Sequence, residues 1–515
     1  MADERILVEG GLVYDHDGDC DRPAALDILI EGARIARVEP GLRAALAGRP
    51  PPDRTIDARR RLVVPGFVNA HYHSHDVLLK GVFDPMPLQM WFVNALPPQY
   101  PIRSAEEVRA RTLLGAAECL LAGITTVQDM LTLYPYDDAL LDAVLAAYDE
   151  IGIRTVFSLQ IGDRRAVDRI PYWREIVPEA YHAYLGSPIG VAAGESPLDM
   201  VARQIDRIGL ARERFSWALG PTSAIMSSPE LLAGIAELSE RHDLPVLTHM
   251  YESRPEVVAS RTHLGAHGGS QIEYMRAAGL LGPRLALAHS IWFADDEIAA
   301  LAEAGGRVVL NPASNMKSKS GVAPIQRYRR AGVEIALGCD NCACSDVQNM
   351  FQSMKLFCGL AAISDTSLET PDAPEAMRAA TLGGAAAVGL AGEVGALRPG
   401  MRADLCLYDL DRPTLLPLNS AARQMVYTET GSALDTVLVE GRVVVEGGRL
   451  ATIDAGALRD SVEAAIGGLR ADQREVAARF ETIRPWLLEA WEKSWETDIG
   501  MDRYVGDAGR PSIRR

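Results

Sequence analysis

The stretch that decides the fold reads VVPGFVNAHYHSH and spans residues 63–75. It is an apolar run that ends in a His-x-His pair, His71 and His73. Residues i and i+2 of a β-strand point to the same face, so these two imidazoles project together. Two adjacent imidazoles at a strand end can bind one divalent metal ion. The pair is equally compatible with two polar residues at a strand-to-loop junction, so partners elsewhere in the chain must decide.

Apolar runs that fit strands alternate with helical stretches through the middle of the chain, as a parallel α/β barrel requires. Eight candidate strands cover residues 62–71, 124–130, 154–161, 215–222, 245–249, 285–289, 307–311 and 334–340. Polar residues stand at or near the ends of these runs, namely His71, His73, Asp129, His249, His289, Asn311 and Asp340. Active sites of such barrels lie at the C-terminal ends of the strands. This shared position is stronger evidence for a site than any single motif.

Two β-rich segments flank the predicted barrel. Residues 5–64 read as short strands separated by glycine turns, and a similar pattern returns at residues 403–444. We expect both chain ends to form one small β-sandwich. The predicted domains are residues 1–64 and 393–450 for the two parts of the sandwich, 65–392 for the barrel, and 451–515 for a C-terminal helical extension with a tail.

The segment PGFVNAHYH, residues 65–73, resembles the first-strand signature of the amidohydrolase superfamily. Within that superfamily the chain resembles the branch of cytosine, guanine and adenosyl-compound deaminases and triazine hydrolases. The resemblance runs from about residue 5 to residue 450. It implies an α/β fold, a (β/α)8 TIM-type barrel with a small β-sandwich formed by both chain ends.

The resemblance also implies roles for the residues at the strand ends. Four residues would hold the metal: His71, His73, His249 and Asp340. Asp340 stands in GCD, residues 338–340, where the family has Gly-Thr-Asp, and would also take a proton from the attacking water. Glu252, in HMYE at residues 249–252, would shuttle protons between water and substrate. His289 would lie beside the metal and contact substrate or water.

One divalent metal is expected. Two-metal branches of the superfamily use a carboxylated lysine at the end of the fourth strand, and residues 215–223 here contain no lysine. Imidazoles and a carboxylate suit Zn²⁺, with Fe²⁺ as the alternative, and the ligands alone do not separate the two.

The implied activity is that of an aminohydrolase, a hydrolase of carbon–nitrogen bonds other than peptide bonds. A metal-bound hydroxide would attack a nitrogen heterocycle or cyclic amidine, and ammonia would leave. In the alternative, the same site removes chloride, alkylamine or thioether from a triazine-like ring. A catalytically inactive scaffold is the third reading, disfavoured because every expected ligand position is filled.

Three further residues are predicted substrate contacts: Trp91, Asn315 and His75. Packing is an equally good role for Trp91, and a solvated loop position is the alternative for His75. Nucleoside deaminases of this branch often carry Pro-His-Ala-Pro-Tyr after the fourth strand, whereas residues 221–225 here read PTSAI. This departure argues against an adenosine-type substrate.

Composition narrows the class of partner. The formal net charge of -17 argues against nucleic acid or an anionic membrane surface. The seven cysteines form neither a disulfide framework nor a zinc-finger pattern. The first residues lack an apolar signal core, and no uncharged run approaches the roughly 18 residues of a membrane span. We expect a cytoplasmic enzyme of a small-molecule substrate, assembled as a homodimer or homotetramer.

Overall fold

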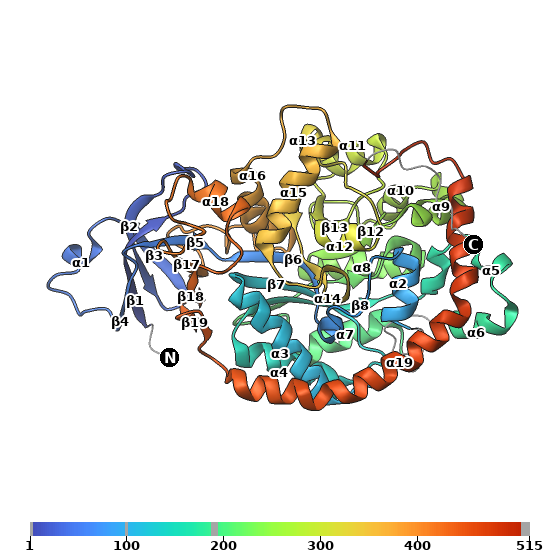
Figure 1. Cartoon of the computed structure of the whole chain (residues 1–515), viewed down its shortest axis with the longest axis horizontal. Helices are drawn as coiled ribbons and strands as arrows, with labels where there is room; N and C mark the ends of the chain where they lie inside the picture. Colours follow the sequence, from blue (N-terminus) through green and yellow to red (C-terminus); the bar gives the residue numbers. More distant parts are fainter. Residues whose placement is uncertain (1–3, 98–100, 187–193, 506–515) are drawn as a thin grey trace.

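The computed structural model describes residues 4–97, 101–186 and 194–505. Figure 1 shows strands and helices in a barrel-like body, with a sheet built from the two ends of the chain beside it. The tail expected beyond residue 505 lies outside the described residues. None of the helices in the described part of the chain is both long and apolar enough to cross a bilayer.

The stretch around the His-x-His pair folds as two strands in different sheets. Strand β5 (Arg61–Pro65) joins the sheet of the chain ends, and β6 (Phe67–His73) joins the barrel. Gly66 separates them, and a Cβ there would lie 2.1 Å from Oγ1 of Thr125. The prediction of one strand over residues 62–71 is therefore wrong, because only glycine permits this close approach while the chain passes from one sheet to the other.

The barrel strands run parallel and are recorded as two sheets. The first contains β16 (Asp340–Asn341), β6, β7 (Ile124–Leu131), β8 (Arg154–Ile161), β10 (Phe215–Trp217), β11 (Gly220–Pro221) and the antiparallel β9 (Ala211–Arg212). The second contains β12 (Val246–Met250), β13 (Leu285–His289), β14 (Arg307–Leu310) and β15 (Glu334–Leu337). Isolated bridges at Leu219–Val246 and Ser223–His249 connect the sheets at one seam. The ladders do not form one continuous ring.

Each of the eight predicted barrel strands coincides with observed strand, but two more of them, besides the first, are divided. The fourth is split into β10 and β11, and the eighth into β15 and β16. In the eighth, Asp340 adopts a positive φ of 64°, which turns the chain where the regular ladder of β15 has ended. The division places the Asp340 carboxylate at the barrel mouth beside β6, to which β16 pairs.

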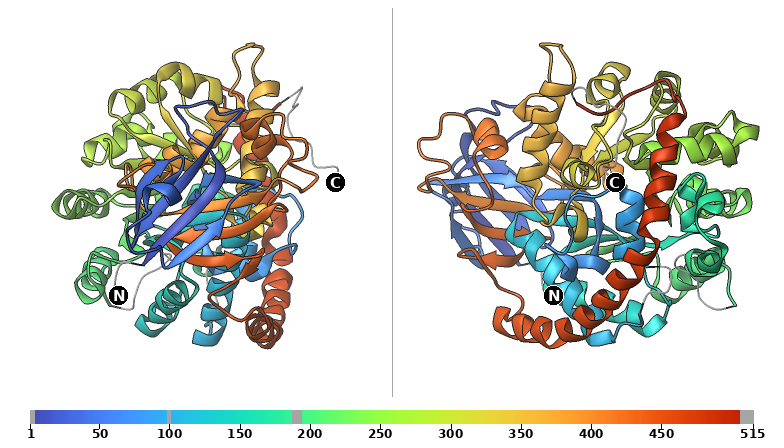
Figure 2. Two further views of the ribbon diagram at one scale, coloured as in Figure 1. Left: turned by 90° about the vertical axis from the view of Figure 1, so that its left-hand side faces the viewer. Right: turned by 45° about the vertical axis from the view of Figure 1, so that its right-hand side comes forward.

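The two ends of the chain meet in one sheet, as Figure 2 shows from the side of that sheet. Its strands are β1 (Arg5–Val13), β2 (Ala24–Glu31), β3 (Arg34–Glu39), β4 (Arg54–Asp57), β5, β17 (Leu405–Asp409), β18 (Leu434–Val439), β19 (Arg442–Glu446) and β20 (Arg449–Leu450). The ends join where β17 pairs antiparallel with β5. The ladders form a single nine-stranded sheet and do not separate into the two sheets expected of a sandwich.

One 39-residue helix, α19 (Ala455–Lys493), takes the place of the several helices expected near the C-terminus. Figures 1 and 2 show it curving along the barrel toward the mouth. Its buried Ile483 and Leu487 share an apolar cluster with Met90 of α2 (Leu88–Ala95). The C-terminal helix α19 therefore packs against α2 through apolar side chains.

A buried ion-pair network ties the barrel to the sheet of the chain ends. Arg154, at the start of β8, donates two hydrogen bonds of 3.0 Å to the Asp404 carboxylate. It also donates one of 3.1 Å to Glu440. The side chains of Asp404 and Glu440 are 1% and 6% exposed. Glu440 also pairs with Arg402 and Arg214, whereas among the described residues the Asp404 carboxylate pairs with Arg154.

Replacing Arg154 by methionine removes the cation that pairs with the buried Asp404 carboxylate, while Glu440 keeps Arg402 and Arg214. We expect Arg154→Met to lower the free energy of unfolding by about 3–5 kcal/mol, the usual result of breaking a buried pair from one side. Urea unfolding followed by circular dichroism measures this loss. Arg203→Met is the control, because Arg203 pairs with Asp138 and Glu195 at an exposed site, where about 1 kcal/mol or less is expected. Equal losses in the two variants would contradict the prediction.

Candidate active site

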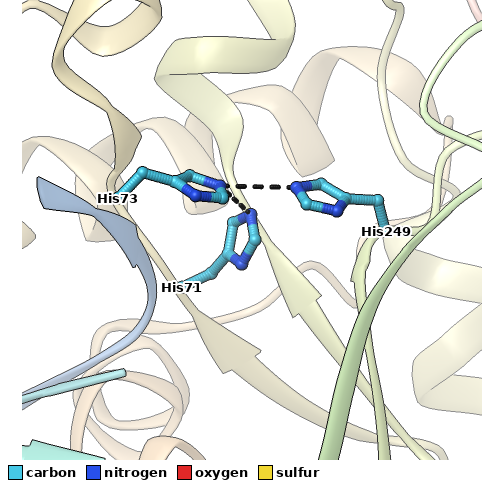
Figure 3. Close-up of side chains that lie close together, drawn as sticks. All are labelled: His71, His73 and His249. Atoms are coloured by element: carbon cyan, nitrogen blue, oxygen red, sulfur yellow. Dashed lines mark hydrogen bonds between the residues drawn. The ribbon is translucent and has the colours of Figure 1, made fainter. Parts of the chain in front are cut away.

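Three histidine nitrogens converge at the mouth of the barrel. Figure 3 shows His71 and His73, from the end of β6, facing His249 from β12. Nε2 of His73 lies 3.3 Å from Nε2 of His71 and 3.4 Å from Nε2 of His249. Oδ1 of Asp340 lies 3.4 Å from Nε2 of both His71 and His73. The structure thus brings together the four predicted metal ligands, and all four are buried.

The protons on two of these rings are placed by backbone carbonyls. Nδ1 of His73 donates to the Met130 carbonyl, and Nδ1 of His249 to the Thr222 carbonyl, each at 2.6 Å. A carbonyl only accepts, so each neutral ring carries its proton on Nδ1 and turns an Nε2 lone pair toward the other. Burial lowers the pKa of His73 to about 3, which keeps its ring neutral. Lone pairs this close, next to a carboxylate, fit a divalent cation.

Two residues of the site have strained backbones. Asp340 has φ of 64° and His289 has φ of 66°, in the left-handed region that side chains other than glycine avoid. Such conformations cost about 1–3 kcal/mol each and persist where the surroundings impose them. The hydroxyl of Ser314 donates to Oδ2 of Asp340 and holds the carboxylate in place. The strained backbone conformations therefore direct the side chains of Asp340 and His289 into the barrel mouth.

Two buried aspartates anchor the loops of the site. Asp76 accepts the backbone N–H groups of Cys342 and Ala343, at 3.0 and 2.9 Å, and so fastens the turn after Asp340. Asp129, expected among the polar residues of the site, instead accepts from the N–H and hydroxyl of Ser74. It does not line the cavity. The sequence analysis missed Asp76, and no local motif marks it.

Glu252 and His289 lie next to each other beside the histidine cluster. Oε2 of Glu252 is 3.7 Å from Nε2 of His289 and 3.3 Å from Nη2 of Arg169. Nδ1 of His289 donates to Oδ1 of Asn315 at 2.8 Å, so Nε2 is the atom that faces the carboxylates of Glu252 and Asp340. Burial raises the pKa of Glu252 despite the opposing charges of His289 and Arg169. A carboxyl group with a raised pKa suits proton transfer near neutral pH.

Several of these groups line one cavity at the barrel mouth. Its lining consists of His73, His75, Leu88, Trp91, Phe92, Leu96, Gln160, Arg169, His249, Glu252, His289, Asp340, Asn341 and Cys344. Two of the predicted substrate contacts, His75 and Trp91, are among them. The third, Asn315, lies behind His289 as its hydrogen-bond partner. Gln160 and Arg169 were missed, because neither stands in a motif; Arg169 belongs to the long connection after β8.

Metal content separates the ligands from their neighbours. We expect the wild-type protein to bind one divalent ion per chain and His249→Ala to lose it, because Nε2 of His249 completes the cluster. His289→Asn should keep the ion, because its Nε2 lies 3.9 Å from Asp340 on the side of Glu252. Elemental analysis of the purified variants, with folding checked by circular dichroism, makes the measurement. Loss of the ion in a folded His289→Asn variant would make His289 a ligand.

Comparisons with known proteins identify the family of the chain. Residues 62–444 match the model of the amidohydrolase family. A 5'-deoxyadenosine deaminase of Methanothermobacter thermautotrophicus is 33% identical over 91% of this chain and 100% of its own. A 5-methylthioadenosine/S-adenosylhomocysteine deaminase of Pyrococcus furiosus is 30% identical over 88% of this chain and 98% of its own.

Solved structures agree with the fold. An adenosine deaminase from Xanthomonas campestris with bound zinc has a TM-score of 0.76 and 26% identity, and covers 93% of this chain and 99% of its own. A zinc complex of an atrazine chlorohydrolase from Arthrobacter aurescens has a TM-score of 0.75, covers 90% of this chain and 100% of its own, and at 24% identity shows the fold alone. The chain belongs to the amidohydrolase family, in its deaminase branch, and is a hydrolase of carbon–nitrogen bonds.

Proposed function

We propose that this chain binds one zinc ion and releases ammonia from an amino group on a heterocyclic ring, with Glu252 and His289 moving the protons. His71, His73, His249 and Asp340 would hold the ion. The observation that carries the proposal is a buried cluster of three histidine Nε2 atoms and the Asp340 carboxylate, beside a cavity that is also lined by Glu252, whose pKa is raised.

The overall reaction fixes what the protein must supply. Water adds its oxygen to a ring carbon, the carbon–nitrogen bond to the amino group breaks, and the ring gains a carbonyl as ammonia leaves. A divalent ion in this site supplies a Lewis acid that brings the pKa of water down toward neutrality. Asp340 accepts the proton that the attacking water gives up, and the hydroxyl of Ser314 keeps its carboxylate oriented.

Glu252 returns that proton to the substrate. An amine is a poor leaving group until it is protonated, so an acid with a raised pKa is needed at neutral pH. Arg169 and the backbone fix the position of Glu252, whose own N–H donates to Glu256 at 3.2 Å. His289 lies between the carboxylates of Glu252 and Asp340, so proton transfer among the three stays inside the cavity.

The two alternative readings have less support. The triazine hydrolases and this chain share a fold at 24% identity or less in the comparison with solved structures, and a chloride leaving group has no need for the acid that Glu252 provides. A scaffold without activity has no need for buried imidazoles that face one another without a proton between them.

Turnover should depend on the acid form of Glu252. We expect Glu252→Gln to retain the metal and to lose on the order of 10²-fold or more in turnover, the scale of general acid–base catalysis. Ammonia release from amino-substituted purines, pyrimidines, pterins and triazines, with ultraviolet detection of the new carbonyl, measures it. Glu240→Gln, on the exposed surface of α8 (Pro229–His242), is the control.

Two results would count against the proposal. Near-normal turnover in Glu252→Gln would remove the proton shuttle. Release of chloride or alkylamine without ammonia from the best substrate would favour the alternative function, hydrolysis of a triazine-like ring.

A further inference from the structure

At one corner of the cavity, two side chains use their acceptor atoms within the protein and leave their N–H donors free to bind a ligand. Thr132, just after β7, makes two hydrogen bonds there. Its backbone N–H donates to Nδ1 of His75 at 3.2 Å, and its hydroxyl donates to Oε1 of Gln160 at 2.7 Å. His75 and Gln160 both line the cavity and are 5% and 7% exposed. A single residue thus uses the acceptor atoms of two cavity side chains.

The groups left over are N–H donors. Because Nδ1 of His75 accepts a hydrogen bond, it is unprotonated and the ring proton lies on Nε2. That Nε2 is buried and has no hydrogen-bond partner among the described residues. With Oε1 of Gln160 occupied, its NH₂ group is the part left to bind a ligand. The indole N–H of Trp91, which also lines the cavity, is likewise buried without a partner in the described chain.

Buried donors without partners are costly unless a ligand satisfies them. Each such group costs about 1–3 kcal/mol, so native proteins keep few of them. A ring nitrogen has one lone pair and satisfies one donor, whereas a carbonyl oxygen accepts two. A ribose hydroxyl also accepts, but it brings a hydrogen of its own, which neither the Nε2–H of His75 nor the NH₂ group of Gln160 can accept. Its chemistry matches a carbonyl oxygen.

We propose that the substrate is an amino heterocycle that also carries a ring carbonyl, and that His75 and Gln160 bind the carbonyl oxygen. This inference rests on the proposed function and names its substrate class. The ring of His75 lies 5.1 Å from the ring of the metal-site residue His73, so the carbonyl binds beside the reacting carbon.

Matched pairs of compounds test the substrate class. Cytosine, isocytosine and guanine carry the carbonyl, and 4-aminopyrimidine, 2-aminopyrimidine and 2-aminopurine are the same rings without it. We expect kcat/KM for ammonia release to be higher for the best carbonyl compound than for its partner by roughly 10²-fold or more, because two buried donors lose their acceptor at about 1–3 kcal/mol each. Calorimetry with the Glu252→Gln variant measures binding of the same pairs without turnover.

Two variants of His75 separate substrate binding from structural support. His75→Asn places an oxygen where Nδ1 stood, so the Thr132 N–H keeps an acceptor while the Nε2 donor is lost. We expect it to lose roughly 10- to 100-fold in kcat/KM for the carbonyl compound, the range for one missing hydrogen bond, with no change for the partner compound. His75→Gln, with an NH₂ group near the Nε2 position, should recover part of the loss. His263→Asn, at an exposed histidine, is the control.

The outcomes distinguish this inference from the proposed function. If metal-loaded enzyme releases ammonia from no amino heterocycle, the proposed function fails and this inference with it. If ammonia is released but both members of a pair react and bind equally, only the carbonyl inference is overturned. If His75 has a purely structural role, His75→Asn will have normal kcat/KM, or it will lose metal and show the same fall in kcat/KM for both compounds. Either result overturns the inference as well.

Discussion

The site depends on the close approach of three imidazole Nε2 atoms and a carboxylate in a buried space. Without a cation between them these atoms have little to attract them to one another, and their desolvation is unfavourable. The protein nevertheless fixes them: carbonyls of Met130 and Thr222 place the ring protons, and Asp340 is held in a left-handed conformation. The surrounding fold imposes a geometry that only a bound metal ion makes favourable.

That geometry is imposed from several distant parts of the chain. Gly66 lets the chain leave the sheet of the chain ends and enter the barrel just before the first two ligands. Arg154 connects the barrel to that sheet through buried carboxylates. Helix α19 supports α2, which brings Trp91 to the cavity. The predicted ligands come from strand ends, whereas the cavity lining also draws on the end of β8 through Gln160, on α2 through Trp91 and on the connection after β8 through Arg169.

Different parts of the cavity have different electrostatic properties, which suit metal binding, proton transfer and substrate binding. Burial lowers the pKa of His73 and keeps it a neutral ligand, and burial also raises the pKa of Glu252 and favours its acid form. The same buried environment thus favours the neutral form of both side chains, the unprotonated imidazole of His73 and the protonated carboxyl group of Glu252. Elsewhere in the cavity, Thr132 donates hydrogen bonds to acceptor atoms of His75 and Gln160. The remaining N–H donors of these two side chains are complementary to an acceptor on the substrate.

The sequence by itself determined the parts that follow from periodicity and chain order. The two-residue repeat of a strand places His71 and His73 on one face, the alternation of strands and helices brings His249, His289 and Asp340 to the same end, and the missing lysine of the fourth strand predicts one metal. Assembly state and cellular location stay predictions. Only the tertiary structure decided that residues 62–71 belong to two sheets, that Asn315 serves His289, and that Arg169 and Gln160 join the cavity. Periodicity specifies which face of an element a residue occupies, but loop residues have no period, and contacts between them are fixed only when the whole barrel packs.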